Sequence, residues 1–185
     1  MIYVALFRGI NVGGHHIVKI ADLTKLFVEL GMTNVKTYIQ SGNIVFAAKE
    51  PPAELHEIIL QGFAAKFGFE PDIMIRSMAD IKKLIEGLPF SQEDMAEVKD
   101  KDPDTVHLYV YFLDDSKTQQ ALAKLLENNE GPDLAQMFPG AIYTLFQTSI
   151  RLSALAAKIT KLGHTTARNW NTVNKIYDLM KSTAE

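Results

Sequence analysis

One order of apolar segments occurs twice along the chain, and it limits the possible folds more than any other feature. The first copy covers residues 1–88 as strand, helix, two strands, helix and strand, followed by one more helix. The second copy covers residues 105–185 in the same order, although the two halves share no repeat of individual residues. A β-α-β-β-α-β order is typical of the ferredoxin-like unit. We therefore predict an α+β fold of two ferredoxin-like units, each followed by a helix, packed together.

Local sequence signals support this order of elements. Ile2–Phe7 is apolar at every position, which is typical of a strand covered on both faces. The pair Ser41-Gly42 fits a two-residue turn between two short strands. Pro139-Gly140 fits a second hairpin, and Ser149 is a candidate N-cap for the helix that follows it. Each half therefore contains one hairpin between its helices.

The two halves are joined by a segment in which the apolar pattern fades. Residues 89–104 begin with a proline, contain a second one and carry a run of acidic side chains. Such composition is typical of a linker. We predict one domain at 1–88, a linker at 89–104 with at most one short helical turn, and a second domain at 105–185.

The topology brings two polar segments to the same edge of the first sheet. With a strand order of 4-1-3-2, the end of strand 1 lies beside the connection between strands 2 and 3. The first segment, Arg8–Gly14, follows strand 1, and the second, Gln40–Asn43, forms that connection. Because these segments converge, we predict a polar rim site there.

The chemistry of these segments suits an anion. Glycines leave backbone N–H groups open to a ligand, and arginine adds a fixed planar charge. A third segment, 166–172, places Arg168 at an expected helix start, where a positive charge is unfavourable unless an anion lies nearby. We therefore expect a site that spans both units. The candidate ligand-binding residues are Arg8, Asn11, Gly13, Gly14, Ser41, Asn43, Arg168, Asn169 and Asn171.

Each of these motifs also has a structural interpretation. Arg8 could pair with a carboxylate, and Ser41 could serve only the hairpin turn. Asn169 or Asn171 could cap the last helix, as Asp115 could cap an earlier one. No acid–base pair or nucleophile stands out, so the sequence leaves open whether the protein is an enzyme.

Composition excludes several classes of function. The chain has 185 residues, a net charge of −3 and no cysteine, so thiol chemistry and disulfides are excluded. The pair His15-His16 lacks further ligands at metal spacing, and we expect neither a metal nor a cofactor. The acidic balance disfavours nucleic acid as a partner, and Tyr109 and Tyr111 are expected to pack in the core. Apolar runs are too short for a membrane span, so we expect a cytoplasmic protein.

The chain resembles a widespread bacterial family, domain-of-unknown-function family 1697. The resemblance rests on three segments, Arg8-Gly-Ile-Asn-Val-Gly-Gly14, Tyr38-Ile-Gln-Ser-Gly-Asn43 and Thr166-Ala-Arg-Asn-Trp-Asn-Thr172. It implies two ferredoxin-like subdomains and no particular activity. Family members often have lysine where His15 and Ile17 stand here, so the loop of this chain is less basic.

Two hypotheses about function remain open at this stage. The first is a binder of a small anionic ligand, such as a nucleotide or a phosphorylated metabolite, at the rim site between the two units. The second is a protein- or RNA-interaction module in which the three motifs are structural. The oligomeric state cannot be derived from these patterns.

Overall fold

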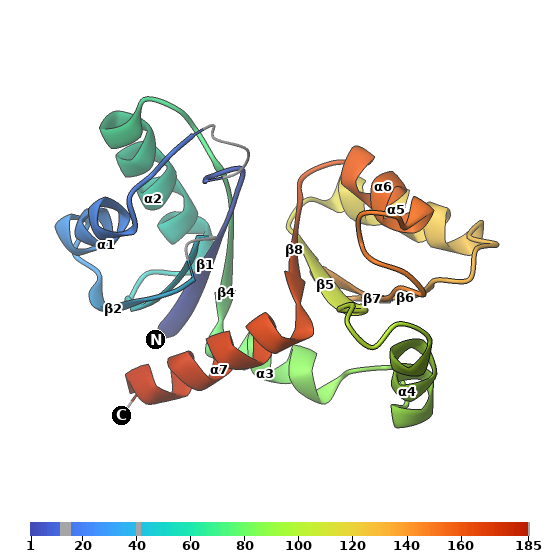
Figure 1. Ribbon diagram of the computed structural model, residues 1–185. Coiled ribbons are helices and arrows are strands. Elements are labelled where there is room, and N and C mark those ends of the chain that lie inside the picture. Colours follow the sequence, from blue (N-terminus) through green and yellow to red (C-terminus); the bar gives the residue numbers. More distant parts are fainter. Residues whose placement is uncertain (12–15, 40–41, 185) are drawn as a thin grey trace. The chain divides into compact units, whose positions relative to one another are not determined.

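The computed structural model describes residues 1–11, 16–39 and 42–184. The chain divides into two compact units (Figure 1). The first consists of Met1–Ile85 together with Asn174–Glu185, and the second of Glu86–Val173. The first unit is therefore discontinuous in sequence, and the last helix of the chain contributes residues to both units.

The first unit contains a four-stranded antiparallel sheet in the order β2-β3-β1-β4, as predicted. Its elements are β1 (Ile2–Arg8), α1 (Ile20–Glu29), β2 (Thr33–Tyr38), β3 (Asn43–Ala47), α2 (Pro52–Phe67), β4 (Asp72–Ser77) and α3 (Met78–Glu86).

Helices α1 and α2 cover one face of this sheet (Figure 1). Phe7 of β1 packs against Phe27 of α1 and Phe63 of α2, with ring centroids 6.2 and 5.5 Å apart. Val4 and Leu6, which alternate with this core face, are also fully buried. Strand β1 is thus covered on both faces, as its continuous apolar run predicts.

The second unit repeats the topology with the sheet order β6-β7-β5-β8. Its elements are α4 (Gln92–Lys101), β5 (Leu108–Leu113), α5 (Ser116–Glu127), β6 (Leu134–Phe138), β7 (Ala141–Leu145), α6 (Ala154–Lys161), β8 (Thr165–Asn169) and α7 (Trp170–Ala184). Leu122 of α5 and Ile159 of α6 pack against Tyr111 in the core.

One arginine occupies an equivalent position in the two sheets, although the halves share no run of identical residues. Val4 of β1 pairs with Arg76 of β4, and Val110 of β5 pairs with Arg168 of β8. In each unit the arginine Nη1 donates to the carbonyl of the preceding residue at 2.8 Å. The residues around each arginine differ, so this equivalence follows only from the strand pairing.

The segment expected to be a linker contains a ten-residue helix, α4. Ser91 and Asp94 form a capping box, in which Asp94 N donates to Ser91 Oγ at 3.0 Å and Ser91 N donates to Asp94 Oδ2 at 2.9 Å. Met95 and Val98 of α4 pack into an apolar cluster with the second sheet. The helix is otherwise largely polar, and this explains why apolar periodicity missed it.

Strand β2 ends at Tyr38, which pairs with Asn43 of β3, and Ser41 of the predicted turn lies outside the described residues. One helix cap also differs from the prediction. Helix α6 is capped by Ser153, whose Oγ accepts a hydrogen bond from Ala156 N at 3.0 Å. Ser149 instead begins the preceding turn, where its carbonyl accepts from Leu152 N. The Pro139-Gly140 hairpin agrees with the prediction.

Buried tyrosines in the second unit predict a loss of stability at alkaline pH. Burial raises the pKa of Tyr143 to about 12, and burial raises the pKa of Tyr111 still further. A phenol with a raised pKa in the folded state stabilises the fold fully below its unfolded pKa of about 10. That contribution is lost as the pH rises from about 10 through the folded pKa.

We therefore expect the protein to unfold above about pH 10. Tyrosinate absorbance should increase, and the far-ultraviolet circular dichroism signal should decrease, over the same pH range. The Tyr143→Phe variant removes one of the two groups, so its unfolding should move to higher pH. Complete tyrosine ionisation near pH 10 with the secondary structure intact would contradict the prediction.

Candidate functional site

The two polar segments of the first unit meet at one edge of its sheet, as the strand order predicts. Phe7 N donates to Gly42 O at 2.8 Å, and Leu6 pairs with Asn43. The end of β1 and the β2–β3 connection are therefore adjacent. Three of the expected site residues, Gly13, Gly14 and Ser41, lie outside the described residues.

Arg8 at this edge has a carboxylate partner within its own unit. It pairs across the sheet with Asp72 of β4, and the distance from Arg8 Nη1 to Asp72 Oδ2 is 3.5 Å. About a third of each side chain is exposed. This arrangement agrees with the structural interpretation of Arg8, in which a protein carboxylate balances its charge.

The asparagines of the first unit hold their own loops. Asn11 has a φ of 57°, and its Nδ2 donates to Val18 O at 2.9 Å while its Oδ1 accepts from Val18 N at 2.8 Å. Asn43 is buried and donates from Nδ2 to Tyr38 O at 3.0 Å. Both amides therefore have a structural role, because each stabilises a loop through bonds to the backbone.

Arg168 lies in β8, directly before Asn169 and the start of α7, close to the helix start where the sequence placed it. Its side chain is buried, and Nη1 donates to Thr166 Oγ1 and to Ala167 O, each at 2.8 Å. Loss of solvent lowers the pKa of the guanidinium to about 10, so Arg168 still carries its charge at neutral pH. The two printed acceptors of this Nη1 are neutral oxygen atoms of β8, so the guanidinium is held by its own strand.

The residues after Arg168 begin α7. Asn169 caps this helix, because its Oδ1 accepts from Thr172 N at 2.8 Å. Trp170 is partly buried beside the cluster of Val98, Leu108 and Leu145. Asn171 is exposed. Of the two asparagines considered as caps from the sequence, Asn169 is the one that caps the helix.

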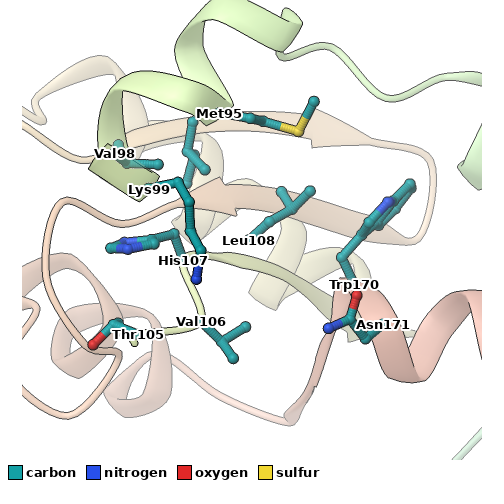
Figure 2. A pocket seen from close by; sticks show the side chains of 10 residues that line it. Met95, Val98, Lys99, Thr105, Val106, His107, Leu108, Trp170 and Asn171 are labelled. Atoms are coloured by element: carbon teal, nitrogen blue, oxygen red, sulfur yellow. The ribbon is translucent and has the colours of Figure 1, made fainter. Parts of the chain in front are cut away.

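Trp170 and Asn171 line a pocket of about 300 Å³ in the second unit (Figure 2). Helix α4 provides one wall, and the segment leading into β5 provides another. In Figure 2, Trp170 and Asn171 lie at one end of the pocket, His107 lies at the other, and Lys99 reaches between them. The lining residues are Met95, Val98, Lys99, Thr105, Val106, His107, Leu108, Leu145, Trp170 and Asn171.

His107 ties the pocket wall to the sheet. Its Nδ1 lies 2.7 Å from Phe146 O, and its Nε2 lies 2.9 Å from Asp102 O. Asp102 is the C-cap of α4. The ring thus connects the end of α4 to the residue that follows β7, and both of its nitrogens face backbone carbonyl groups rather than the pocket.

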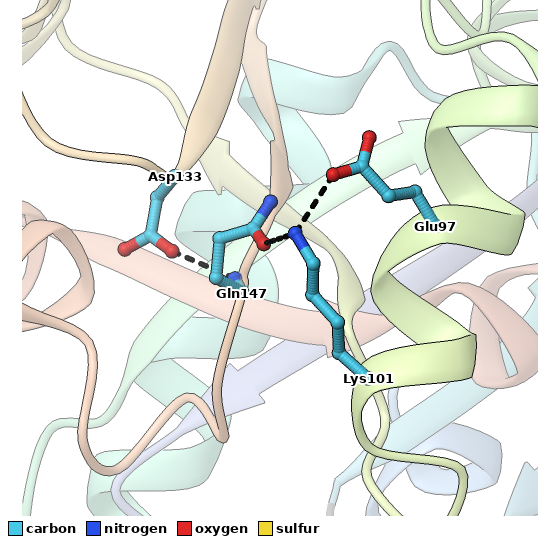
Figure 3. A network of polar contacts seen from close by, with 4 residues as sticks. All are labelled: Glu97, Lys101, Asp133 and Gln147. Atoms are coloured by element: carbon cyan, nitrogen blue, oxygen red, sulfur yellow. Dashed lines mark hydrogen bonds and ion pairs between the residues drawn. The ribbon is translucent and has the colours of Figure 1, made fainter.

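A polar network lies nearby in the second unit (Figure 3). Lys101 of α4 donates to Glu97 Oε1 at 2.7 Å and to Gln147 Oε1 at 3.0 Å. Gln147 N in turn donates to Asp133 Oδ1 at 2.8 Å. Asp133 also accepts from Ser153 Oγ at 2.7 Å, so it supports the cap of α6.

Sequence reasoning identified only part of this pocket. It singled out Asn171 but missed the α4 residues, because that segment was read as a linker. The pattern of a serine followed three residues later by an acidic residue, at Ser91 and Asp94, could have revealed the helix start. Met95 and Val98 then follow at the spacing of one helical turn.

Two further classes of site are absent from the described part of the chain. Among residues 1–11, 16–39 and 42–184, no group of three or more His, Asp or Glu side chains could hold a metal ion. Within the same ranges, no helix is long and apolar enough to cross a membrane. His15 of the expected histidine pair lies outside these residues.

These features define an α+β protein of two units that share the same topology, with a pocket in the second unit. The chain belongs to the family described as protein of unknown function (DUF1697), whose model matches residues 1–143. It is similar to the conserved bacterial protein SP0830 from Streptococcus pneumoniae, with 25% sequence identity and a TM-score of 0.78. That match covers 97% of this chain and 98% of the other. None of the curated proteins matches.

Proposed function

We propose that the protein binds a small anionic organic ligand in the pocket beside Trp170. The pocket itself is the observation that carries this proposal: about 300 Å³, with apolar walls and a few polar groups. Pockets of this kind are typical of small-molecule sites. Lys99 is the cation among its lining residues, and none of them is acidic. An anion is therefore favoured over a cation.

The expected affinity requires both the charge and the apolar walls. A charge-assisted hydrogen bond to Lys99 would contribute about 1.5–3 kcal/mol. Micromolar binding corresponds to about 8 kcal/mol. The difference has to come from apolar contact with Trp170, Leu108 and their neighbours, at about 25 cal/mol per Å² of buried surface. A ligand with an apolar body and a charged group fits this requirement.

The rim of the first unit is a weaker candidate for the same function. A nucleotide or phosphorylated metabolite there would compete with Asp72 for Arg8. Asn11 and Asn43 would have to give up bonds to the backbone. For these reasons we assign the anionic ligand to the pocket of the second unit.

A second candidate is an interaction module, and one observation favours it. Three asparagines of the sequence motifs, Asn11, Asn43 and Asn169, make internal hydrogen bonds. An RNA surface is the less favoured form of this alternative. Tyr111 is buried in the helix-side core and Tyr109 packs against it, so these rings are not presented for base stacking.

Trp170 provides the test of the ligand proposal, because it is the only tryptophan in the sequence. Its fluorescence reports on the pocket selectively. We expect at least one anionic compound in a metabolite library to change this fluorescence and to raise the melting temperature. The ligand-induced shift follows from binding to the folded state alone.

A pair of matched variants separates the pocket from the rest of the surface. Val106→Phe adds volume at a half-exposed residue that lines the pocket, so ligand binding should weaken. Leu162→Phe makes a similar change at an equally exposed residue at the end of α6, outside the pocket lining, and should leave binding unaltered. Equal responses of both variants, or no response to any anion, would refute the proposal.

A further inference from the structure

We infer that the ligand of this pocket is an aromatic monocarboxylate, a planar ring carrying one negative charge. This inference rests on the proposed function, because it names the chemical class of the ligand for the same pocket. Three observations carry it: the aromatic wall, the single cation among the lining residues and the limited volume.

The aromatic wall favours a planar ring. Trp170 is half-buried, and its ring centroid lies 6.5 Å from that of Tyr143 at an interplanar angle of 61°. This contact fixes the indole from one side. A ring in the pocket could then stack on Trp170 or meet it edge to face, as aromatic pairs prefer. Leu108 and Leu145 add apolar surface around the same space.

The charge in the pocket matches a single anionic group. Lys99 Nζ donates to Pro103 O, and an ammonium group has three donors in total. The other N–H groups of Lys99 can therefore donate to one carboxylate. A second or third negative charge on the ligand would meet no other cation among the lining residues. A polyphosphate is therefore disfavoured.

The remaining polar groups are too few for a sugar. Thr105 and Asn171 are the other lining residues whose side chains can face a ligand, since both ring nitrogens of His107 contact carbonyl oxygens. Ribose hydroxyl groups would therefore find few hydrogen-bond partners among the lining residues. At about 300 Å³, the pocket also lies at the small end of ligand sites. A compact ring with one carboxylate meets each of these limits.

The test compares three probes, indole-3-acetate, neutral indole and AMP, by thermal shift and isothermal titration calorimetry. We expect indole-3-acetate to bind more tightly than indole, because only the acid can pair with Lys99. AMP, with its ribose and doubly charged phosphate, should bind at least about tenfold more weakly than indole-3-acetate. Indole probes absorb where Trp170 does, so heat and melting temperature are the readouts.

Two lysine variants assign the charge. Lys99→Gln should weaken indole-3-acetate at least about tenfold while leaving the affinity for indole unchanged. Lys124→Gln, on the exposed surface of α5 and outside the pocket lining, should leave both affinities unchanged. Equal affinity of Lys99→Gln and the unaltered protein for indole-3-acetate would overturn the role of Lys99.

Failure of the ligand class and failure of the pocket as an anion site give different results. Tight binding of AMP with weak binding of indole-3-acetate would overturn the aromatic monocarboxylate and leave the anion pocket standing. If none of the three probes and no library anion binds, both the pocket function and its ligand class fail. Binding of indole-3-acetate that Val106→Phe does not weaken would place the ligand elsewhere and overturn the inference.

Discussion

Replacing Gly42 with alanine should destabilise the protein by about 2–5 kcal/mol. Gly42 has a φ of 75°, and a residue with a Cβ atom costs about 1–2 kcal/mol in this region. A Cβ atom here would also lie 2.7 Å from Phe7 Cβ and 2.9 Å from Ile10 Cδ1. Relieving such crowding in a packed region costs about 1–3 kcal/mol more. The glycine of this motif is therefore required by packing.

The matched control for this change is Gly68→Ala. Gly68 has a similar φ of 79°, but an added Cβ atom would meet nothing within 4 Å. This variant should lose only the backbone contribution, about 1–2 kcal/mol. Denaturant unfolding of both variants measures the difference. Equal losses would show that the close approach of Gly42 to Phe7 does not contribute.

Replacing Asp133 with alanine should destabilise the second unit by about 3–5 kcal/mol. The carboxylate is buried and accepts from Gln147 N at 2.8 Å and from Ser153 Oγ at 2.7 Å. Alanine would leave both donors inside the protein without an acceptor. Ser153 would also lose the bond that orients it toward Ala156 N, so the start of α6 should loosen.

Lys101→Ala provides the control from the same network. Lys101 also contacts Gln147, but its ion pair with Glu97 is more than half exposed on both sides. Its loss should change the free energy of unfolding by less than about 1 kcal/mol. Unfolding followed by circular dichroism tests both variants. If Lys101→Ala lowered the free energy of unfolding as much as Asp133→Ala, the buried carboxylate would not be the main stabilising group of this network.

The topology could be predicted from sequence because local signals and apolar patterns agreed. The run Ile2–Phe7, the prolines at the start of α2 and Gly68 after its end each specify their element without long-range information. Helix α4 was missed because its burial comes from two residues, Met95 and Val98, too few to produce a visible period. Its capping box was the available signal.

The pocket could not be predicted, because it depends on contacts between residues far apart in sequence. Met95 of α4, Leu145 of β7 and Trp170 of α7 meet only after the sheet has formed. The asparagines of the motifs could be identified from sequence, but their role could not. Their residue type suits a ligand and a loop equally well, and only the bonds of Asn11 to Val18 decide for the loop.

The discontinuous first unit constrains the order in which the chain can mature during synthesis. Residues 86–173 leave the ribosome before Asn174–Glu185, which complete the first unit. In that unit, Lys36 of β2 donates to Ser182 O at 2.8 Å, and Asn34 donates to Thr183 O at 3.5 Å. These bonds are unavailable to a nascent chain until that last segment has been made. The second unit can therefore finish folding first, although its sequence begins later.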